Sequence, residues 1–355
     1  MTLPHGGNIY YYSRKYGIPE RDILDFSASI NPLGPPESAL KALAQAVPSL
    51  VNYPDPDCTA LREALSARMG VDGGSIVFGN GSTELIYLLP RALAPKKVLV
   101  TAPGFSDYER AARLAGCEVL YLTLREENRF EPDMDALRGA LEGVGLFFLC
   151  NPNNPTGALL KKDAVREITG IASGMGVTTC VDEAFMDFVP GESVVGEAAE
   201  QDGVAVLRNF TKFYAMPGLR LGYLVAGPGL AEKLRRAQEP WSVNTLAQAA
   251  AAAALSDAGF ARASLRLMDA EREYLCRALS GLPGLEPFPA SANFILVKLK
   301  GIASAELAEA LARRGILVRD CGNFRGLDGE FVRVAVRTRS EDERLVEALE
   351  SFTIK

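Results

Sequence analysis

The stretch VAVLRNFTKFYAMPGLRLGY, residues 204–223, carries the features that decide the fold and chemistry of this chain. Its apolar run, residues 204–207, is typical of a short buried strand. A polar turn with Thr211 and Lys212 follows, and Arg220 precedes a second apolar run. Burial at a strand end lowers the pKa of a lysine and favours the neutral amine that forms a Schiff base. A surface lysine whose stem lies along apolar neighbours is the alternative interpretation.

The composition narrows the class of protein. The chain has 355 residues, of which 48% are hydrophobic and 23% are charged, which predicts a soluble globular protein that is large enough for two domains. A net charge of −6 provides no basic field for nucleic acid or an anionic membrane. Neither a signal-peptide pattern nor a membrane-spanning stretch is present. The six cysteines form no CxxC pair, which predicts reduced thiols in the cytoplasm.

His5 is the sole histidine of the chain. One histidine supports neither a histidine-based metal site nor a Ser–His–Asp triad, so we predict no metal. The surrounding HGGN, residues 5–8, is interpreted from the residues alone as a flexible terminus. The alternative is a flap whose imidazole and backbone N–H groups reach an anionic substrate.

Apolar runs alternate with helical patterns from residue 76 to residue 210, which predicts an α/β domain with a mostly parallel sheet. A long helical region, residues 230–279, is interrupted at Pro240-Trp241-Ser242, and a strand–helix–strand pattern follows. We therefore expect an N-terminal flap and joining segment at 1–49, a large domain at 50–270, and a smaller α+β domain at 271–355.

Polar or aromatic side chains stand at or just past the ends of the predicted strands. They are Phe105, Asn154, Asp182 and Lys212. Ligands in parallel sheets bind beyond the carboxyl ends of the strands, so these four residues are expected to meet.

Charge-binding groups accompany them. The turn Gly79-Asn80-Gly81 opens a helix at Ser82 and Thr83, where free N–H groups suit a phosphate, although Ser82 could simply cap the helix. Arg319 and Arg333 lie on predicted strands and could bind carboxylate or phosphate, or be exposed edge residues.

Together these side chains describe a site for pyridoxal phosphate. Phe105 would stack on its ring, Asp182 would pair with the ring nitrogen, and Asn154 would hydrogen-bond a ring oxygen. Lys212 would form the imine. The phosphate would be held by Gly81, Ser82, Thr83, Thr211 and Arg220.

The chain resembles the fold-type-I pyridoxal-phosphate enzymes of the aspartate aminotransferase superfamily over nearly its whole length. The matching motifs are NPNNPTG at 151–157, DEAF at 182–185 and TKFYAMPGLRLGY at 211–223. Within the superfamily it is most similar to the threonine-phosphate decarboxylase branch, near histidinol-phosphate aminotransferases. HGGN, LDFSASINPLG at 24–34 and EPWSVN at 239–244 carry this finer resemblance.

The resemblance implies the same cofactor roles, with Lys212 and Asp182 as catalytic residues. It further implies that Tyr53 reaches the cofactor phosphate of a neighbouring subunit, in a homodimer with shared sites. The implied substrate-binding residues are His5, Asn31, Asn154, Arg319 and Arg333. Two positions depart from the superfamily pattern. Phe185 stands where many members have a tyrosine that donates to the ring oxygen, and Asn209 replaces the usual Ser or Thr.

The implied reaction is decarboxylation of L-threonine O-3-phosphate to (R)-1-amino-2-propanol O-2-phosphate for cobalamin biosynthesis. The alternative is a histidinol-phosphate or related aminotransferase with the same cofactor site. The bond held perpendicular to the cofactor ring is the one that breaks, and the residues do not reveal that orientation. A non-catalytic effector module of a transcription regulator is a third hypothesis, and it would need a basic DNA-binding domain that is not visible.

Overall fold

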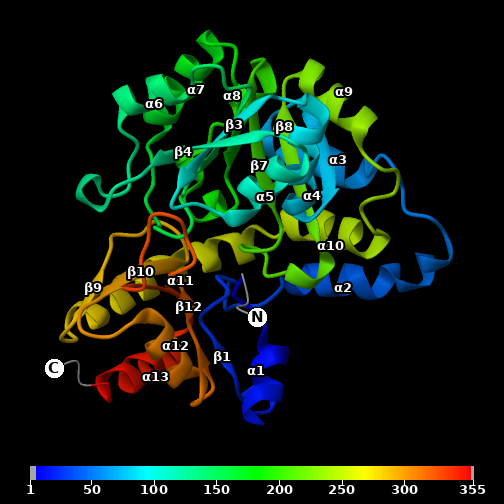
Figure 1. Ribbon diagram of the computed structural model, residues 1–355. Coiled ribbons are helices and arrows are strands. Elements are labelled where there is room, and N and C mark those ends of the chain that lie inside the picture. The colour runs from blue at the N-terminus through cyan, green and yellow to red at the C-terminus, as the bar shows by residue number, and fades with distance from the viewer. Residues whose placement is uncertain (1–4, 353–355) are drawn as a thin grey trace.

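The computed structural model describes residues 5–352 and contains a large central sheet beside a smaller one (Figure 1). The large sheet has seven strands in the order β2-β8-β7-β6-β5-β3-β4. Only β8 runs antiparallel to its neighbours, so the predicted mostly parallel α/β sheet is confirmed. The strands are β2 Ile76–Asn80, β3 Lys97–Ala102, β4 Glu118–Thr123, β5 Leu146–Cys150, β6 Thr178–Asp182, β7 Val204–Asn209 and β8 Leu221–Ala226.

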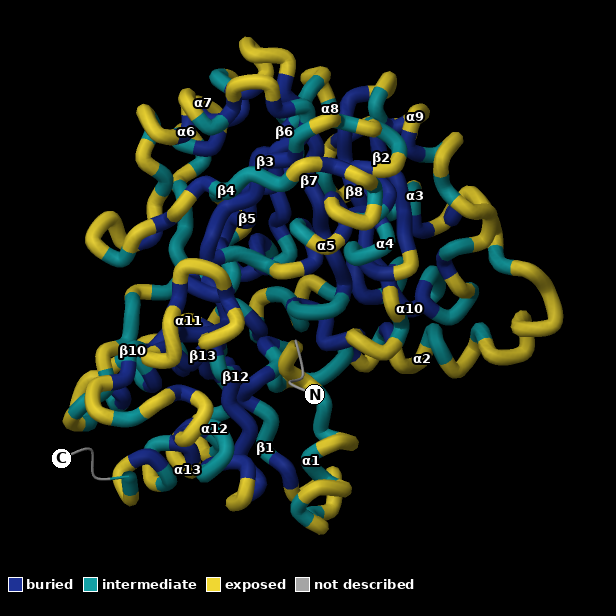
Figure 2. The backbone as a smooth tube through the Cα atoms, in the orientation of Figure 1, coloured by how far each residue is buried: buried dark blue, intermediate teal, exposed yellow. Residues whose placement is uncertain are grey.

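Helices cover both faces of this sheet, which is why its central strands are apolar along their whole length. Alternate residues of β5 point to opposite faces. Phe148 packs with the core next to α4, α5 and α9, whereas Phe147 packs with the core next to α6, α7 and α8. Figure 2 shows the strands buried and the outer helix faces exposed. These helices are α4 Gly81–Leu93, α5 Ser106–Leu114, α6 Met134–Ala140, α7 Lys162–Gly174, α8 Val195–Glu200 and α9 Pro228–Ala237.

The smaller sheet is antiparallel and has the strand order β12-β13-β10-β9. A separate two-residue parallel pair joins β1 to β11 and so ties the N-terminal segment to the C-terminal part of the chain (Figure 1). The strands are β1 Leu24–Asp25, β9 Leu285–Pro287, β10 Phe294–Leu299, β11 Ile316–Leu317, β12 Arg319–Asp320 and β13 Phe331–Ala335. The accompanying helices are α1 Ile9–Tyr16, α12 Ser304–Ala312 and α13 Arg339–Glu350.

The remaining helices connect the two sheets. They are α2 Glu37–Ala46, α3 Thr59–Met69, α10 Thr245–Leu255 and α11 Ala258–Ser280, and the alanine-rich α10 packs against α2 and α3. The helical region after residue 230 breaks twice, not once. The missed break lies before α11, where the Asp257 side chain accepts a hydrogen bond from the N–H of Phe260 and caps the new helix.

Helix α11 runs continuously across residue 270, so the predicted domain boundary falls inside a helix, and the division into domains stays a prediction. Within residues 5–352, no helix is long and apolar enough to cross a membrane. Short 3₁₀ turns span Glu20–Asp22, Val47–Val51, Gly73–Ser75, Glu126–Asn128, Met186–Phe188, Pro190–Glu192 and Pro217–Leu219.

A buried ion-pair network ties β7 to the segment that follows β6. Arg208 Nε donates to Glu183 Oε2 at 3.0 Å, and Arg208 Nη1 donates to Asp187 Oδ1 at 2.9 Å. Glu183 Oε2 also accepts from Ser193 Oγ, at 2.7 Å. Charges this deeply buried are tolerated only because each has partners.

Arg208→Met should lower the free energy of unfolding by about 3–5 kcal/mol, because it leaves two carboxylates without their cation. Arg113→Met is the matched control, since Arg113 pairs with Glu109 on an exposed helix surface and should cost less than about 1 kcal/mol. Thermal and urea unfolding of the two variants measures the difference. Equal losses would contradict a stabilising role for the buried network.

Candidate active site

A cavity of about 230 Å³ lies at the carboxyl ends of the central parallel strands, between the large sheet and the smaller one. The predicted site residues that line it are His5, Ser82, Thr83, Phe105, Asn154, Asp182, Thr211, Lys212, Arg220, Arg319 and Arg333. Gly81, Asn31 and Tyr53 are not among its lining residues. The convergence expected from the strand ends is therefore present.

Lys212 is held by a turn that the Asn209 side chain organises. Asn209 Oδ1 accepts hydrogen bonds from the N–H groups of Thr211, at 2.9 Å, and Lys212, at 3.2 Å. Burial, together with the positive charges of Arg333 and Arg220, lowers the pKa of Lys212 to about 8. The amine is thus far closer to its reactive neutral form than a surface lysine is.

Asn31 has a different position from the one the resemblance implied. Its side-chain Nδ2 donates to the carbonyl of Phe213 at 2.8 Å and to Ser264 Oγ at 2.7 Å. Its backbone N–H donates to the carbonyl of Lys212 at 3.0 Å. The side-chain amide and the backbone N–H of Asn31 therefore stabilise the segment that contains Lys212. Asn31 does not line the cavity.

Asp182 ends β6 and is 4% exposed. Its Oδ1 accepts from the N–H of Ala184 at 2.9 Å, and its Oδ2 accepts from the hydroxyl of Tyr108 at 2.5 Å. Burial raises the pKa of Asp182 to about 6. Glu183 and Lys212 act on this carboxylate in opposite directions, and a protonated ring nitrogen in the cavity would supply a direct positive partner.

Tyr108 was missed by the reasoning from sequence. It stands three residues after Phe105, so one turn of helix brings both rings to the same face of α5. Their rings meet edge to face with centroids 5.6 Å apart. The spacing was available in the sequence, but it equally suits a core tyrosine.

The turn before α4 fits a phosphate group. Gly81 has a φ of +75°, and a Cβ there would lie 2.5 Å from Arg220 Nη2, so glycine is required for the arginine to approach. The 13-residue helix α4 directs its first N–H groups toward this point, beside Ser82 and Thr83. Arg220 and Thr211 complete the cradle from the lysine turn. These donors and the buried carboxylate of Asp182 together match pyridoxal phosphate.

Arg333 lines the cavity. It is 7% exposed, so the alternative of an exposed edge residue is wrong for it. Its Nη1 donates to Asn154 Oδ1, its Nη2 donates to the carbonyl of Ser27 at 2.9 Å, and burial lowers its pKa to about 10. A guanidinium this desolvated gains most from an anionic ligand.

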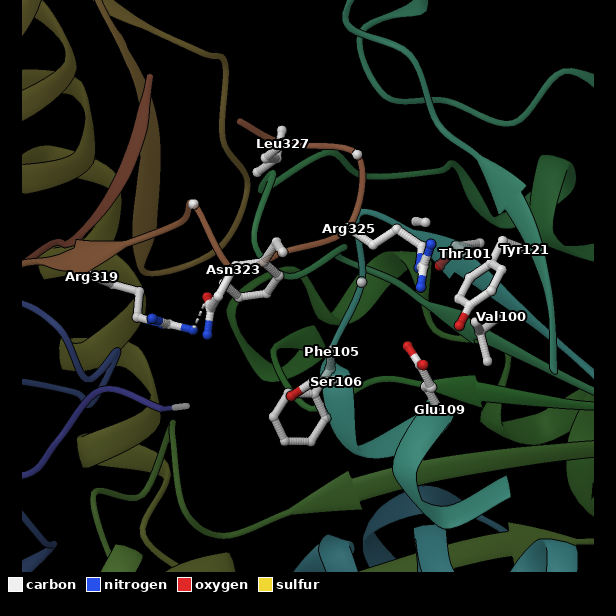
Figure 3. Close-up of a pocket in the computed structure, with 15 residues that line it drawn as sticks. Val100, Thr101, Phe105, Ser106, Glu109, Tyr121, Arg319, Asn323, Arg325 and Leu327 are labelled. Carbon is white, nitrogen blue, oxygen red and sulfur yellow. Dashed lines mark hydrogen bonds between the residues drawn. The ribbon is translucent and has the colours of Figure 1, made fainter. Parts of the chain in front are cut away.

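Arg319 also lines the cavity and is 8% exposed, so it too is not an exposed edge residue. Its guanidinium donates to Asn323 Oδ1 and to the carbonyl of Asp320, both at 2.7 Å. A second cavity of about 420 Å³ opens on its other side, where Arg325 lies 4.0 Å over the ring of Tyr121 (Figure 3). Arg319 and Phe105 line both cavities.

His5 and Gly6 line the cavity, which is the position that the alternative of a flap predicts. Gly6 packs so closely on the carbonyl of Ser27 that a Cβ there would collide with it. The His5 ring lies 5.5 Å from that of Phe105, and its Nε2 is 3.8 Å from Asp107 Oδ2. Burial lowers the pKa of His5 despite this carboxylate.

Tyr53 lies away from the cavity and is 79% exposed. Its ring stacks on Trp241 with centroids 4.8 Å apart. Trp241 is also exposed, so this aromatic pair forms an apolar surface patch.

Comparison with known proteins agrees with this geometry. Residues 21–349 match the family described as aminotransferase class I and II. The chain is 38% identical to threonine-phosphate decarboxylase of Salmonella typhimurium, over 97% of this chain and 95% of that protein. It is 35% identical to histidinol-phosphate aminotransferase of Methanosarcina mazei, over 97% and 92%.

Solved structures show the same likeness. L-Threonine-O-3-phosphate decarboxylase from Porphyromonas gingivalis has a TM-score of 0.84 and 29% identity, over 94% of this chain and 100% of that one. Histidinol-phosphate aminotransferase from Clostridium acetobutylicum has a TM-score of 0.87 and 31% identity, over 93% and 99%. These findings confirm the resemblance and the fold-type-I architecture expected from the motifs.

The pKa of Lys212 predicts how its attachment to pyridoxal phosphate depends on pH. Because the pKa is about 8 and not the usual 10.5, the rate of attachment to cofactor-free protein should rise about tenfold per pH unit below 8 and level off above it. Stopped-flow absorbance measures this rate, and Lys212→Ala is the control without covalent attachment. A rate that is still rising at pH 10 would contradict the lowered pKa.

Proposed function

Because the chain belongs to the family of class I and II aminotransferases, we propose that it decarboxylates L-threonine O-3-phosphate to (R)-1-amino-2-propanol O-2-phosphate for cobalamin biosynthesis. The observation that carries the proposal is the pair of buried arginines that line one cavity with Lys212. Arg333 and Arg319 provide two anion sites, and an amino acid phosphate carries two anionic groups. The whole-length similarity to a threonine-phosphate decarboxylase supports the same substrate.

Pyridoxal 5′-phosphate is the cofactor, and when bound it supplies an electron sink for the charge left at a carbon atom whose bond has broken. Lys212 would hold it covalently, and Asp182 would pair with its ring nitrogen. Phe105 would stack on its ring. The phosphate would lie in the cradle of Gly81, Ser82, Thr83, Thr211 and Arg220.

Asn154 would donate to the ring oxygen without a second donor from a tyrosine. Its Oδ1 already accepts from Arg333, which leaves the Nδ2 group as the donor. Phe185, which lines the cavity at the position of the usual tyrosine, has no hydroxyl and instead packs edge to face on Phe294 with ring centroids 4.9 Å apart.

The two arginines have different neighbours, which suggests how the substrate lies. The charge of Arg333 acts on Lys212 more strongly than that of any other residue, so Arg333 would bind the carboxylate, next to the reacting carbon. Arg319 faces His5 and opens onto the second cavity. Arg319 and His5 would therefore bind the phosphate, with the charge of His5 dependent on pH.

Lys212 would transfer a proton to or from the reacting carbon of the substrate. With a pKa of about 8 it holds a proton at neutral pH and releases it readily, which suits a general acid that protonates the substrate carbon after carbon dioxide leaves. In the alternative function, a histidinol-phosphate or related aminotransferase, the same amine would remove the proton from that carbon. The similarity to histidinol-phosphate aminotransferases keeps this second candidate open.

A homodimer is also proposed, since a patch of apolar side chains is exposed around α2. Its members are Leu33, Leu40, Val47, Leu50, Val51, Tyr53 and Trp241. Tyr53 from this patch would reach the cofactor phosphate in the neighbouring subunit. A cytoplasmic location is proposed as well, because all six cysteines are free thiols and five of them are buried.

The reaction is tested by incubating the protein and cofactor with L-threonine O-3-phosphate and measuring carbon dioxide and the phosphorylated amine. We expect carbon dioxide in amounts equal to the amine, no keto acid, and no turnover by Lys212→Ala. Histidinol phosphate with 2-oxoglutarate is the comparison substrate pair. Glutamate formation from that pair, without carbon dioxide from threonine phosphate, would establish the aminotransferase instead.

The dimer is tested by light scattering on Val51→Asp, because Val51 is 88% exposed within the apolar patch. We expect the parent protein at twice the chain mass of 38.1 kDa and the variant shifted toward that single-chain mass, since a buried charge is costly at an interface. Met175→Asp changes an exposed apolar residue outside the patch and is the control. A monomeric parent would contradict the proposed dimer.

A further inference from the structure

The hydroxyl of Tyr108 lies beside the cofactor site, where it donates to Asp182 and neighbours the thiol of Cys150. We propose that Tyr108 is a positioning residue that keeps the Asp182 carboxylate ionised and turned toward the ring nitrogen of the cofactor. This inference rests on the proposed cofactor. It goes beyond that proposal because Tyr108, which was not among the predicted site residues, would control how strongly Asp182 pairs with the ring nitrogen.

The Tyr108 ring is fixed on several sides, so its hydroxyl has little freedom. The side chain is 1% exposed. Its ring stacks on Phe148 of β5 with centroids 4.9 Å apart and an interplanar angle of 7°, and it meets Phe105 edge to face. Phe105 is the predicted stacking partner of the cofactor ring. Tyr108 thus contacts both Phe105, which would stack on the cofactor ring, and the Asp182 carboxylate, which would pair with the ring nitrogen.

The Asp182 carboxylate depends on such support. Its two oxygens have one donor each, the N–H of Ala184 and the hydroxyl of Tyr108. Burial raises its pKa, whereas the two hydrogen bonds lower it. The neighbouring charges act in opposite directions, since Glu183 raises this pKa and Lys212 lowers it. Loss of the hydroxyl would therefore favour the protonated carboxyl group, which cannot pair with a positively charged ring nitrogen.

The direction of the hydrogen bond is also determined by the surroundings. Burial raises the pKa of Tyr108 well above its ordinary value, so the phenol keeps its proton and acts as the donor. Hydrogen bonds to charged acceptors are short and about twice as strong as neutral ones, and the 2.5 Å separation of the two oxygens agrees with this.

Tyr108→Phe removes the hydroxyl and keeps the ring packing. Cofactor-free protein is titrated with pyridoxal phosphate, and the dissociation constant of the variant should rise about tenfold. The visible absorbance of the bound cofactor is then followed against pH. The variant should have less positive charge on the ring nitrogen, and that charge repels the proton on the nitrogen that joins Lys212 to the cofactor. With weaker repulsion this proton is held more tightly, so the midpoint of the titration should move to higher pH.

Tyr87→Phe is the matched control, because the Tyr87 hydroxyl donates to Asp107 at 3.3 Å, outside the cofactor site. It should leave both the dissociation constant and the midpoint unchanged. Incorporation of 3-fluorotyrosine at position 108, which keeps the hydroxyl, should restore both values. The melting temperature of each variant reports whether it is folded.

The possible outcomes separate the two proposals. A Tyr108→Phe protein with an unchanged midpoint would overturn the positioning role, even if its affinity fell, because packing alone would then explain the loss. The same shift in Tyr87→Phe would overturn it as well. A parent protein that binds no pyridoxal phosphate would instead overturn the proposed function.

Discussion

The candidate site depends on the removal of the Lys212 amine from water at the carboxyl edge of the large sheet. Burial and two arginine charges bring its pKa to about 8. The structure maintains this state through backbone hydrogen bonds, because Asn209 caps the turn from one side and Asn31 braces it from the other. A lysine on a mobile surface loop keeps a pKa of about 10.4, so a far smaller fraction of its amines would be neutral and reactive at neutral pH.

Burial also changes the pKa values of the groups that share the cavity with Lys212. Arg333 is desolvated and has its own pKa lowered, while Asp182 has its pKa raised. Groups perturbed in opposite directions within one cavity are typical of catalytic sites, since their preferred charges are restored only when a ligand of matching charge binds. The site is therefore complementary to a ligand that carries a ring cation, a phosphate and a further anion.

Much of this arrangement could be predicted from particular residues. The apolar strands and the helices between them specify a parallel sheet, and Phe105, Asn154, Asp182 and Lys212 meet because parallel strands present their carboxyl ends at one edge. Other assignments depended on the fold. Asn31 was expected at the substrate, but the polypeptide turns its side chain toward Phe213 and Ser264. Tyr108 gave no distinguishing signal, because a core tyrosine and one that supports a carboxylate have the same spacing.

By itself, the sequence determined the sheet class and placed a lysine and a carboxylate at the ends of strands, because these follow from local apolar patterns and from the order of residue types along the chain. Only the tertiary structure decided which side chains face the cavity and how charged they are. The pairing of β1 with β11 brings Ser27 and His5 over the site from nearly 200 residues away from Lys212. Exposure and pKa depend on every atom that excludes water from a group, and those atoms come from all parts of the chain.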